Sequence, residues 1–471
     1  MDNVHSSPLP ADAPLYPPTV PAPEKLLPLW RMLPTFVRNP LRATPRAAYD
    51  DDLVVFRPTK TRSIVWLSDP AMVERVLVAE ADKVVKSPAE VRVLGASLAG
   101  SILLAEGADW RWQRRALAPL FRAADIQNYV PAMAAAADAQ VLRWRAAAVA
   151  GDQTHAIDND MLKVTFDVII ATMLVGGRPA EAETILKAGS DYLARASWPL
   201  AYALLRMPQW MPHPATGTMR RAATAMRGAV SAIVARRRTE GGAPQDLLGR
   251  LLAARHPDTN EPMADDLVIS NLLTLLEAGH ETTAKALTWT LYLLARSPHW
   301  QQRVHDEVIN VASDGPLTPP QLSRLVVTLR VIKEAMRLYP PAPVMARLTT
   351  VPMTFTGSDG KVHRLPKGTQ LIIPIYAIHR HTKLWADPDR FDPDRFLPAA
   401  EAGRPRTQYM PFGGGPRVCI GAQFAMTEAT VLLATFIRAA RFEWDGHHLP
   451  EPVSRVTLRP DGGMPLKVVM R

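Results

Sequence analysis

The sequence predicts a mainly α-helical fold with a small β subdomain, built as one large domain. Apolar residues recur at helical spacing through most of the range 110–350, and short strand-like runs lie near both ends of that range. No segment repeats at a period typical of solenoids. With 471 residues, 47% of them hydrophobic and 21% charged, the chain has a globular composition and can bury a large interior.

In chain order, residues 1–25 come first and carry seven prolines. Proline at this density favours extended backbone, so we expect a flexible, poorly packed arm before a domain at 26–471. Short strands are expected at 54–56 and 64–67, where β-branched and aromatic residues gather between polar turns. Asp69 ahead of Pro70 is typical of a helix start.

One helix stands out, because Leu267–Ala295 contains no proline and carries apolar residues on nearly every face. At 1.5 Å per residue it would be roughly 45 Å long and would cross the domain as a buried spine. After it, residues 353–355 and 371–373 predict strands on either side of the turn at 358–360. A helix over 430–440 and short strands within 453–469 complete the chain.

The single cysteine excludes an intramolecular disulfide and favours a reducing compartment. The N-terminal segment lacks a basic region before an apolar run, and no apolar stretch of roughly 18 residues occurs near either end. We therefore expect a cytoplasmic enzyme with no membrane span. The net charge is +10, but the basic residues are scattered, which gives nucleic-acid binding little support and leaves a modest attraction for acidic protein partners.

Within the long helix lies the segment Ala278-Gly279-His280-Glu281-Thr282-Thr283. Burying a charge and hydroxyls costs free energy unless they are paired or used. Ala278 and Thr282 are four residues apart and share a face, where a flat ligand could approach the backbone. Alternatively, the threonines only hydrogen-bond to carbonyls one turn earlier.

A second segment, residues 412–421, is a glycine-rich loop that places the only thiol ahead of a helix beginning near Ala422. A thiolate is stabilised at a helix N-terminus and near a cation such as Arg417, and glycines allow backbone amides to approach the sulfur. These features favour a metal ligand at Cys419. A lone cysteine can also be a small buried hydrophobic residue, although this glycine–arginine setting is unusual for one.

The positions of Phe412, Gly415, Arg417, Cys419 and Gly421 resemble the complete haem-loop signature of the cytochrome P450 family. The resemblance runs from about residue 45 to the C-terminus and suggests a soluble, bacterial-type member. It implies the cytochrome P450 fold, heme b (iron protoporphyrin IX) as the cofactor, and the sulfur as its axial iron ligand.

Two further motifs carry the resemblance. Glu334 and Arg337 match the family's Glu-x-x-Arg helix, and Arg395 lies in a segment resembling the one that supplies another arginine. An exposed pair of this kind would contribute only about 0.3–0.5 kcal/mol. The resemblance implies instead a buried triad that braces the cysteine loop, from which removal of one partner would cost about 3–5 kcal/mol.

The resemblance also extends to Trp110 and Arg114, which match a Trp-x-x-x-Arg helix, and to Arg347. It implies that both arginines bind haem propionates, for which the planar guanidinium is suited, although surface arginines are the ordinary alternative. By position, Val344 and Met345 should line the substrate pocket. The segments expected around that pocket are largely apolar, which favours a lipophilic small-molecule substrate.

The implied reaction inserts one oxygen atom from O₂ into the substrate, a hydroxylation. Thr282 would hydrogen-bond dioxygen or an adjacent water, Glu281 would help to relay protons, and Ala278 would leave room for the ligand. Arg92 could bind a substrate carboxylate, as a fatty acid would require, but a solvated loop arginine is equally compatible. Terpenoids, aromatic compounds and fatty acids stay open as substrates.

No G-x-G-x-x-G fingerprint lies between a strand and a helix, so we expect the electrons to come from a separate ferredoxin or flavodoxin with its reductase. The arginine-rich segment Arg111–Arg122 could face the acidic surface of that partner. Two alternatives remain. One is a peroxygenase driven by hydrogen peroxide, although such enzymes generally lack the Glu281–Thr282 pair, and the other is a haem-binding sensor without turnover.

Overall fold

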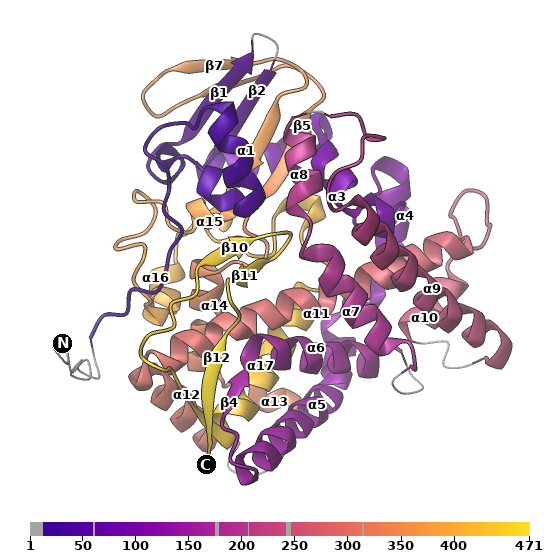
Figure 1. The fold of residues 1–471 in the computed structure, drawn as a ribbon, viewed down its shortest axis with the longest axis vertical. Coiled ribbons are helices and arrows are strands. Elements are labelled where there is room, and N and C mark those ends of the chain that lie inside the picture. Colours follow the sequence, from indigo (N-terminus) through magenta and orange to yellow (C-terminus); the bar gives the residue numbers. More distant parts are fainter. Residues whose placement is uncertain (1–12, 60–61, 175–178, 206, 242–245, 313–314) are drawn as a thin grey trace.

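The computed structural model confirms a mainly helical domain with small sheets (Figure 1). It describes residues 13–59, 62–174, 179–205, 207–241, 246–312 and 315–471. The longer helices are α1 (Leu29–Arg38), α3 (Pro88–Leu98), α4 (Gly107–Leu117), α5 (Ala123–Val149), α6 (Ile157–Met173), α7 (Ala182–Leu193), α8 (Ser197–Leu204), α9 (Thr216–Glu240), α10 (Leu247–Ala253), α11 (Asp265–Ala295), α12 (Pro298–Val311), α14 (Val326–Leu338) and α17 (Ala422–Ala439). The short helices are α2 (Pro70–Glu74), α13 (Pro319–Leu322), α15 (Ile375–Ile378) and α16 (Pro398–Glu401).

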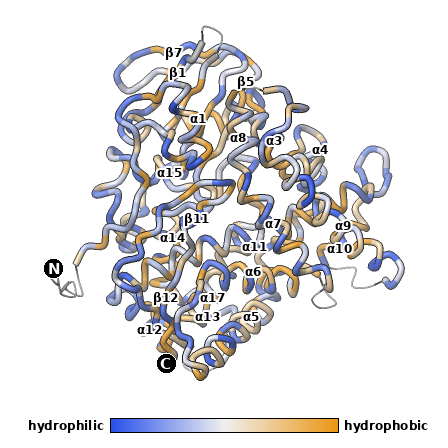
Figure 2. The backbone as a smooth tube through the Cα atoms, in the orientation of Figure 1, coloured by the Kyte–Doolittle hydropathy of each residue, from blue (hydrophilic) through white to orange (hydrophobic). Residues whose placement is uncertain are grey.

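The predicted spine is α11, which crosses the middle of the molecule among α6, α14 and α17 (Figure 1). Its side chains from 283 to 295 are all buried, as the apolar residues on every face predict. Figure 2 shows hydrophobic stretches along the central helices and hydrophilic stretches in the peripheral loops. In the part of the chain that is described, no helix combines the length and the apolar character needed to cross a bilayer.

Within the described ranges, the strands form four small sheets. Their bounds are β1 (Leu53–Thr59), β2 (Arg62–Leu67), β3 (Val84–Lys86), β4 (Thr154–Ala156), β5 (Met345–Thr349), β6 (Met353–Thr356), β7 (Val362–Leu365), β8 (Gln370–Ile373), β9 (Ala440–Glu443), β10 (Pro452–Ser454), β11 (Leu458–Pro460) and β12 (Pro465–Met470). The largest sheet has the order β1-β2-β8-β5-β3, with β2 and β8 parallel and the other neighbours antiparallel. This sheet brings β5, which carries Arg347, beside strands from the first hundred residues.

The turn at 358–360 connects different strands from those expected. β6 pairs across this turn with β7, while β8 leaves the hairpin and joins the large sheet. No apolar run marks β7 in the sequence, because the polar residues His363 and Arg364 form its middle. The helix start at Pro70 is as predicted, since the Asp69 side chain accepts a hydrogen bond from the Met72 N–H at 2.8 Å.

Residues 13–25, the described part of the proline-rich arm, are extended but not poorly packed. Leu15 and Val20 are buried in the main core, and the Phe391 N–H donates to the Leu15 carbonyl at 2.9 Å. The Tyr339 hydroxyl donates to the carbonyl of Pro18 at 2.8 Å. The expectation of a loose arm is therefore wrong for these residues, because each proline still offers a carbonyl and an apolar ring to the domain. Residues 1–12 lie outside the described part.

Candidate active site

The glycine-rich loop lies immediately before α17 and is held by its own backbone. The Cys419 N–H donates to the carbonyl of Phe412 at 2.9 Å, and the Val418 N–H donates to that of Gly415 at 3.0 Å. Gly415 has a φ of +68°, and a Cβ there would lie 2.0 Å from the carbonyl oxygen of Leu77. Only glycine fits this position, so the loop conformation that presents the cysteine depends on it.

The thiol of Cys419 has accessible surface although protein atoms surround it. Burial raises the pKa of the thiol, while a hydrogen bond from the Gly421 N–H and the charge of Arg114 act in the opposite direction. The cation expected beside the sulfur was Arg417, but its guanidinium pairs with Glu106 instead. The protein alone therefore does not hold this cysteine as a thiolate, and a bound metal ion would have to do so.

Arg114 and Arg347, the two arginines expected to bind haem propionates, lie near Arg417 of the loop. Arg114 in α4 donates to the carbonyl of Val418 at 2.9 Å, and Arg417 lies over the ring of Trp110 at 4.2 Å. The pKa of Arg417 is below its ordinary value, mainly because of burial, and the charge of Arg347 lowers it further. Cations held this close together away from water are suited to binding anions such as carboxylates.

The middle of α11 is accessible along part of its surface. Between residues 270 and 295 the side chains are buried, with five exceptions. The exceptions are Leu275, Glu277, Ala278, Gly279 and Thr282, of which Ala278 is the most exposed. Because α11 runs through the interior, accessible surface at its centre marks an internal space.

The hydroxyl of Thr282 donates to the carbonyl of Ala278 at 2.7 Å, and that of Thr283 donates to the carbonyl of Gly279 at 3.2 Å. The structure thus contains the local hydrogen bonds that the sequence left open as an alternative. A hydroxyl has one proton and two lone pairs. The Thr282 oxygen can therefore still accept a hydrogen bond from a molecule in the internal space.

Glu281 is buried and paired with residues near the C-terminus. Its Oε1 accepts a hydrogen bond from the Thr457 hydroxyl at 2.9 Å and lies 2.9 Å from Nη2 of Arg459. Burial alone would raise the pKa of Glu281, but Arg459 and then Lys285 hold it below its ordinary value. The carboxyl is therefore ionised. Thr457 and Arg459 carry no local sequence signal that links them to a helix far earlier in the chain.

The predicted triad is assembled. The guanidinium of Arg337 forms two hydrogen bonds to the carboxylate of Glu334, at 2.7 and 2.8 Å, and neither side chain is exposed. Nε of Arg395 lies 3.6 Å from the same carboxylate. An exposed, weakly stabilising pair is therefore the wrong interpretation, and a buried network is the right one.

His379, which the sequence analysis missed, links this triad to the cysteine loop. Arg337 donates to the His379 carbonyl at 2.7 Å, and the His379 Nε2 accepts a hydrogen bond from the Met410 N–H at 3.0 Å. Burial, and then the charge of Arg337, lower the pKa of His379 to about 3. The imidazole is therefore neutral and can accept. The Met410 carbonyl in turn accepts a hydrogen bond from the Gly413 N–H at 3.0 Å, at the start of the loop.

The two residues expected in the substrate pocket lie at the start of β5. Val344 is 37% exposed, and the sulfur of Met345 is 3.4 Å from the position that a Cβ on Gly413 would take. Arg92 is engaged elsewhere, because its guanidinium donates to the backbone carbonyls of Met207 and Pro208. The geometry gives no support to a carboxylate site at Arg92.

These residues fit a haem. The loop presents one accessible thiol, which is a ligand for iron, and the neighbouring arginines are suited to the two carboxylates of a porphyrin. An accessible strip of α11 supplies a surface for a flat group. Among the described residues, no group of three or more His, Cys, Asp or Glu side chains could hold a metal ion without such a cofactor.

Comparisons with known proteins agree. The family model described as cytochrome P450 matches residues 49–466. Cyclooctatin synthase of Streptomyces melanosporofaciens is 30% identical, over 92% of this chain and 91% of its own length. Pentalenene oxygenase of Streptomyces avermitilis is also 30% identical, over 92% and 89%. Cyclooctat-9-en-7-ol 5-monooxygenase of Streptomyces melanosporofaciens is 31% identical, over 72% of each chain.

The matched range contains the cysteine loop, the triad and the accessible strip of α11. The functional prediction from the sequence is confirmed: the chain is a haem-dependent monooxygenase that uses O₂, a redox partner and a lipophilic substrate. It belongs to the cytochrome P450 family.

Proposed function

We propose that Cys419 is the axial ligand of heme b and that Arg114, Arg347 and Arg417 bind its propionates. The single observation that carries this proposal is the lone accessible thiol beside clustered, partly buried guanidinium groups. When bound, haem iron with an anionic sulfur ligand supplies cleavage of the O–O bond. We also assign Trp110, Phe412, Gly415, Gly421 and Ala278 to cofactor binding.

In this proposal Thr282 and Glu281 deliver protons to the site of oxygen binding. The Thr282 hydroxyl donates its hydrogen bond to the Ala278 carbonyl, so its oxygen is left to accept one from another molecule. A water molecule bound in this way would lie beside dioxygen. Glu281 is ionised and can take up a proton when its contact with Arg459 opens. We assign Thr282 to positioning the water and Glu281 to carrying protons toward it.

The substrate is a lipophilic small molecule, and we propose that it is uncharged. Val344 and Met345 offer apolar surface next to the cysteine loop, and Arg92 is already occupied by backbone carbonyls. The names of two relatives refer to an alkene, pentalenene, and to an alkenol, cyclooctat-9-en-7-ol. Compounds of this kind, terpenoids among them, therefore rank ahead of fatty acids.

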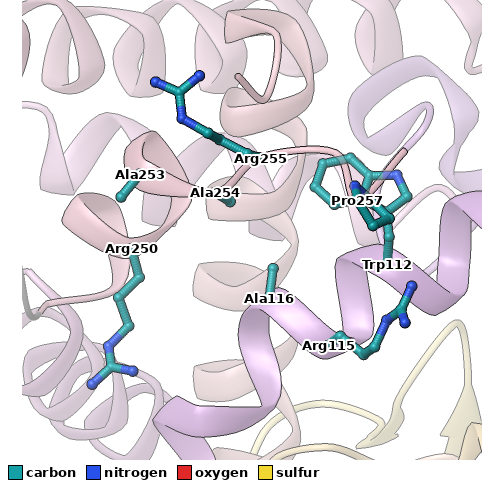
Figure 3. A pocket seen from close by; sticks show the side chains of 8 residues that line it. All are labelled: Trp112, Arg115, Ala116, Arg250, Ala253, Ala254, Arg255 and Pro257. Carbon is teal, nitrogen blue, oxygen red and sulfur yellow. The ribbon is translucent and has the colours of Figure 1, made fainter. Parts of the chain in front are cut away.

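The redox partner is proposed to be a ferredoxin or flavodoxin that docks on α4. This helix contacts the cysteine loop through Arg114 and exposes Arg111 and Arg115 on its outer face. A pocket of about 580 Å³ continues this surface toward α10 (Figure 3). Its lining includes three arginines, which are Arg115, Arg250 and Arg255. Such a surface favours an acidic partner. The lone cysteine favours a cytoplasmic location.

Two other activities use the same loop, a peroxygenase and a haem sensor without turnover. We rank the peroxygenase lower because the Glu281–Thr282 pair is present. Purified holoenzyme should form product from a lipophilic test substrate with NADH, surrogate ferredoxin and ferredoxin reductase, and only when O₂ is present. Product that requires hydrogen peroxide alone would indicate the peroxygenase, and the absence of product from both systems would indicate the sensor.

The ligand assignment has a separate test. Replacing the cysteine by serine, Cys419→Ser, should abolish the red-shifted absorption band that thiolate-ligated haem gives when it is reduced and bound to carbon monoxide. The reason is that an alcohol oxygen is a much weaker anionic donor than sulfur. A variant that kept the band would show that another side chain holds the iron.

A further inference from the structure

Glu277 is a partly buried acid with an enclosed carboxyl oxygen, and the mechanism above has no use for it. It lies in the accessible stretch of α11, next to exposed Ala278 and one turn before Glu281. Its Oε1 is buried and has no hydrogen-bond partner among the described residues. A buried polar atom without a partner costs about 1–3 kcal/mol, so it requires an explanation.

In the described part of the chain, no neighbouring charge pairs with the carboxyl group of Glu277 and so explains its position. The guanidinium of Arg459 is 2.9 Å from the carboxylate of Glu281, which also accepts the hydrogen bond from Thr457. Burial, and then the negative charge of Glu281, raise the pKa of Glu277 to about 8. At neutral pH this side chain is therefore mostly a neutral carboxylic acid, which can both donate and accept a hydrogen bond.

The chain makes room for this carboxyl group. A Cβ on Gly189, in α7, would lie 2.5 Å from each of its two oxygens. Any other residue at position 189 would push the carboxyl group away. The glycine of α7 and the glutamate of α11 thus form one arrangement, in which the carboxyl group lies against α7 and its residue directly precedes the accessible Ala278.

We propose that Glu277 is a substrate-specificity residue that hydrogen-bonds a hydroxyl group of the substrate. This inference rests on the proposed function, because it assumes that the internal space beside α11 receives the lipophilic substrate. A hydroxyl satisfies the acid in both directions, as donor and as acceptor. A pure hydrocarbon leaves the acid unpartnered, and a carboxylate is repelled by the negative charge of Glu281 nearby. The substrate class is therefore a hydrocarbon skeleton that already carries an alcohol.

A matched series of probes tests the proposal: adamantane, adamantanol, adamantylamine and adamantane carboxylate, which share one skeleton. Their dissociation constants are measured on holoenzyme from the substrate-induced change in the haem absorption spectrum. Wild type should bind adamantanol most tightly of the four. Replacing the acid by a hydrocarbon side chain of similar size, Glu277→Leu, should weaken adamantanol binding roughly tenfold, the size expected for one buried hydrogen bond, and leave adamantane binding within about threefold.

Two further variants separate hydrogen bonding from shape. Glu277→Gln keeps a donor and an acceptor, so it should retain most of the preference for the alcohol. Gly189→Ala adds a methyl group where the carboxyl oxygens lie, so it should reduce the preference while every acidic residue is still present. Retention of the carbon monoxide band, together with a cooperative unfolding transition whose midpoint is not below that of wild type, shows that each variant is folded and loaded with haem.

Three results would overturn the proposal. Equal effects of Glu277→Leu on adamantane and adamantanol would make Glu277 a packing residue. Tightest binding of adamantylamine, with a spectral change that excludes ligation of the iron by its nitrogen, would show that the acid is ionised and selects cations. Tightest binding of adamantane carboxylate would exclude alcohols as the preferred substrate class. If wild-type holoenzyme bound none of the four probes, the proposed lipophilic pocket would be wrong as well, which is a distinguishable outcome.

Discussion

At the scale of single residues, Thr282 acts through its lone pairs, because its proton is donated to the Ala278 carbonyl. Replacing it, Thr282→Ala, should leave haem binding and substrate binding unchanged but divert most of the reducing equivalents into hydrogen peroxide. The variant lacks the hydroxyl oxygen that holds a water molecule in place. Protons are then no longer directed to the oxygen atom that must leave as water, and hydrogen peroxide is released instead. The ratio of product to NADH consumed, together with peroxide release, measures this effect.

Thr290→Ala is the matched control for that experiment. Its hydroxyl makes the same kind of bond, to the Ala286 carbonyl at 2.7 Å, but the side chain is fully buried two turns further along α11. Its coupling of NADH to product should equal that of wild type. Equal uncoupling in both variants would show that the helix, and not the accessible oxygen, is responsible.

The pKa values of Glu277 and Glu281, one turn apart in α11, are shifted in opposite directions. The pKa of Glu277 is raised to about 8 by burial, so the folded protein keeps this proton while the unfolded chain loses it near the ordinary value of 4.5. Proton binding that is stronger in the folded state makes stability fall as the pH rises between 4.5 and about 8. Glu277→Gln should remove this loss, and for a shift of this size its gain over wild type at the upper end is on the order of 5 kcal/mol.

Urea unfolding of the two proteins across this pH range measures the difference. Glu281 supplies the opposite sign, because Arg459 holds its pKa below the ordinary value despite burial. Its contribution is present above the unfolded pKa and is lost only as the pH falls through the folded one. Glu281→Gln should therefore destabilise the protein at neutral pH. A stability lead of Glu277→Gln that did not change with pH would contradict the assignment.

At the scale of elements, α14 holds the cysteine loop through a buried charge network. Removing its acid, Glu334→Ala, strands the fully buried guanidinium of Arg337 and should cost about 3–5 kcal/mol of unfolding free energy. Haem should also dissociate faster, since the chain of hydrogen bonds through His379 reaches the loop. Thermal unfolding and the rate of haem transfer to apomyoglobin measure the two effects.

The neighbouring residue on α14 provides the control. Lys333 pairs with Glu401 at 2.9 Å, but both side chains are about one-third exposed. Lys333→Ala should therefore cost less than about 1 kcal/mol and leave haem retention unchanged. Comparable losses in the two variants would mean that the triad stabilises the protein no more than a surface pair does.

The sequence predicts elements that follow a local pattern, but it does not predict contacts between distant parts of the chain. α11, the loop before α17 and the Glu334–Arg337 pair are local patterns of period or spacing, and each was found where expected. The contacts of Glu281 with Thr457 and Arg459 join residues far apart in the chain, and no local pattern encodes them. Glu277 could have been found, because it shares a face of a buried helix with Glu281.

At the scale of the whole molecule, the net charge of +10 favours docking of an acidic redox partner only where cations lie near the cysteine loop. α4 is that place, since Arg114 contacts the loop while Arg115 is exposed and borders the arginine-lined pocket (Figure 3). The docking proposal therefore depends on the position of the charge as well as on its amount, and two variants of equal net charge can distinguish these.

Reversing the charge on this face, Arg115→Glu, should slow reduction of the haem by ferredoxin roughly tenfold at low salt and flatten its dependence on ionic strength. Arg221→Glu makes the same change in net charge at an exposed position of α9 and should leave reduction close to the wild-type rate. Stopped-flow reduction over a series of salt concentrations gives both quantities. Equal slowing by the two variants would mean that only total charge attracts the partner, and the docking surface would then lie elsewhere.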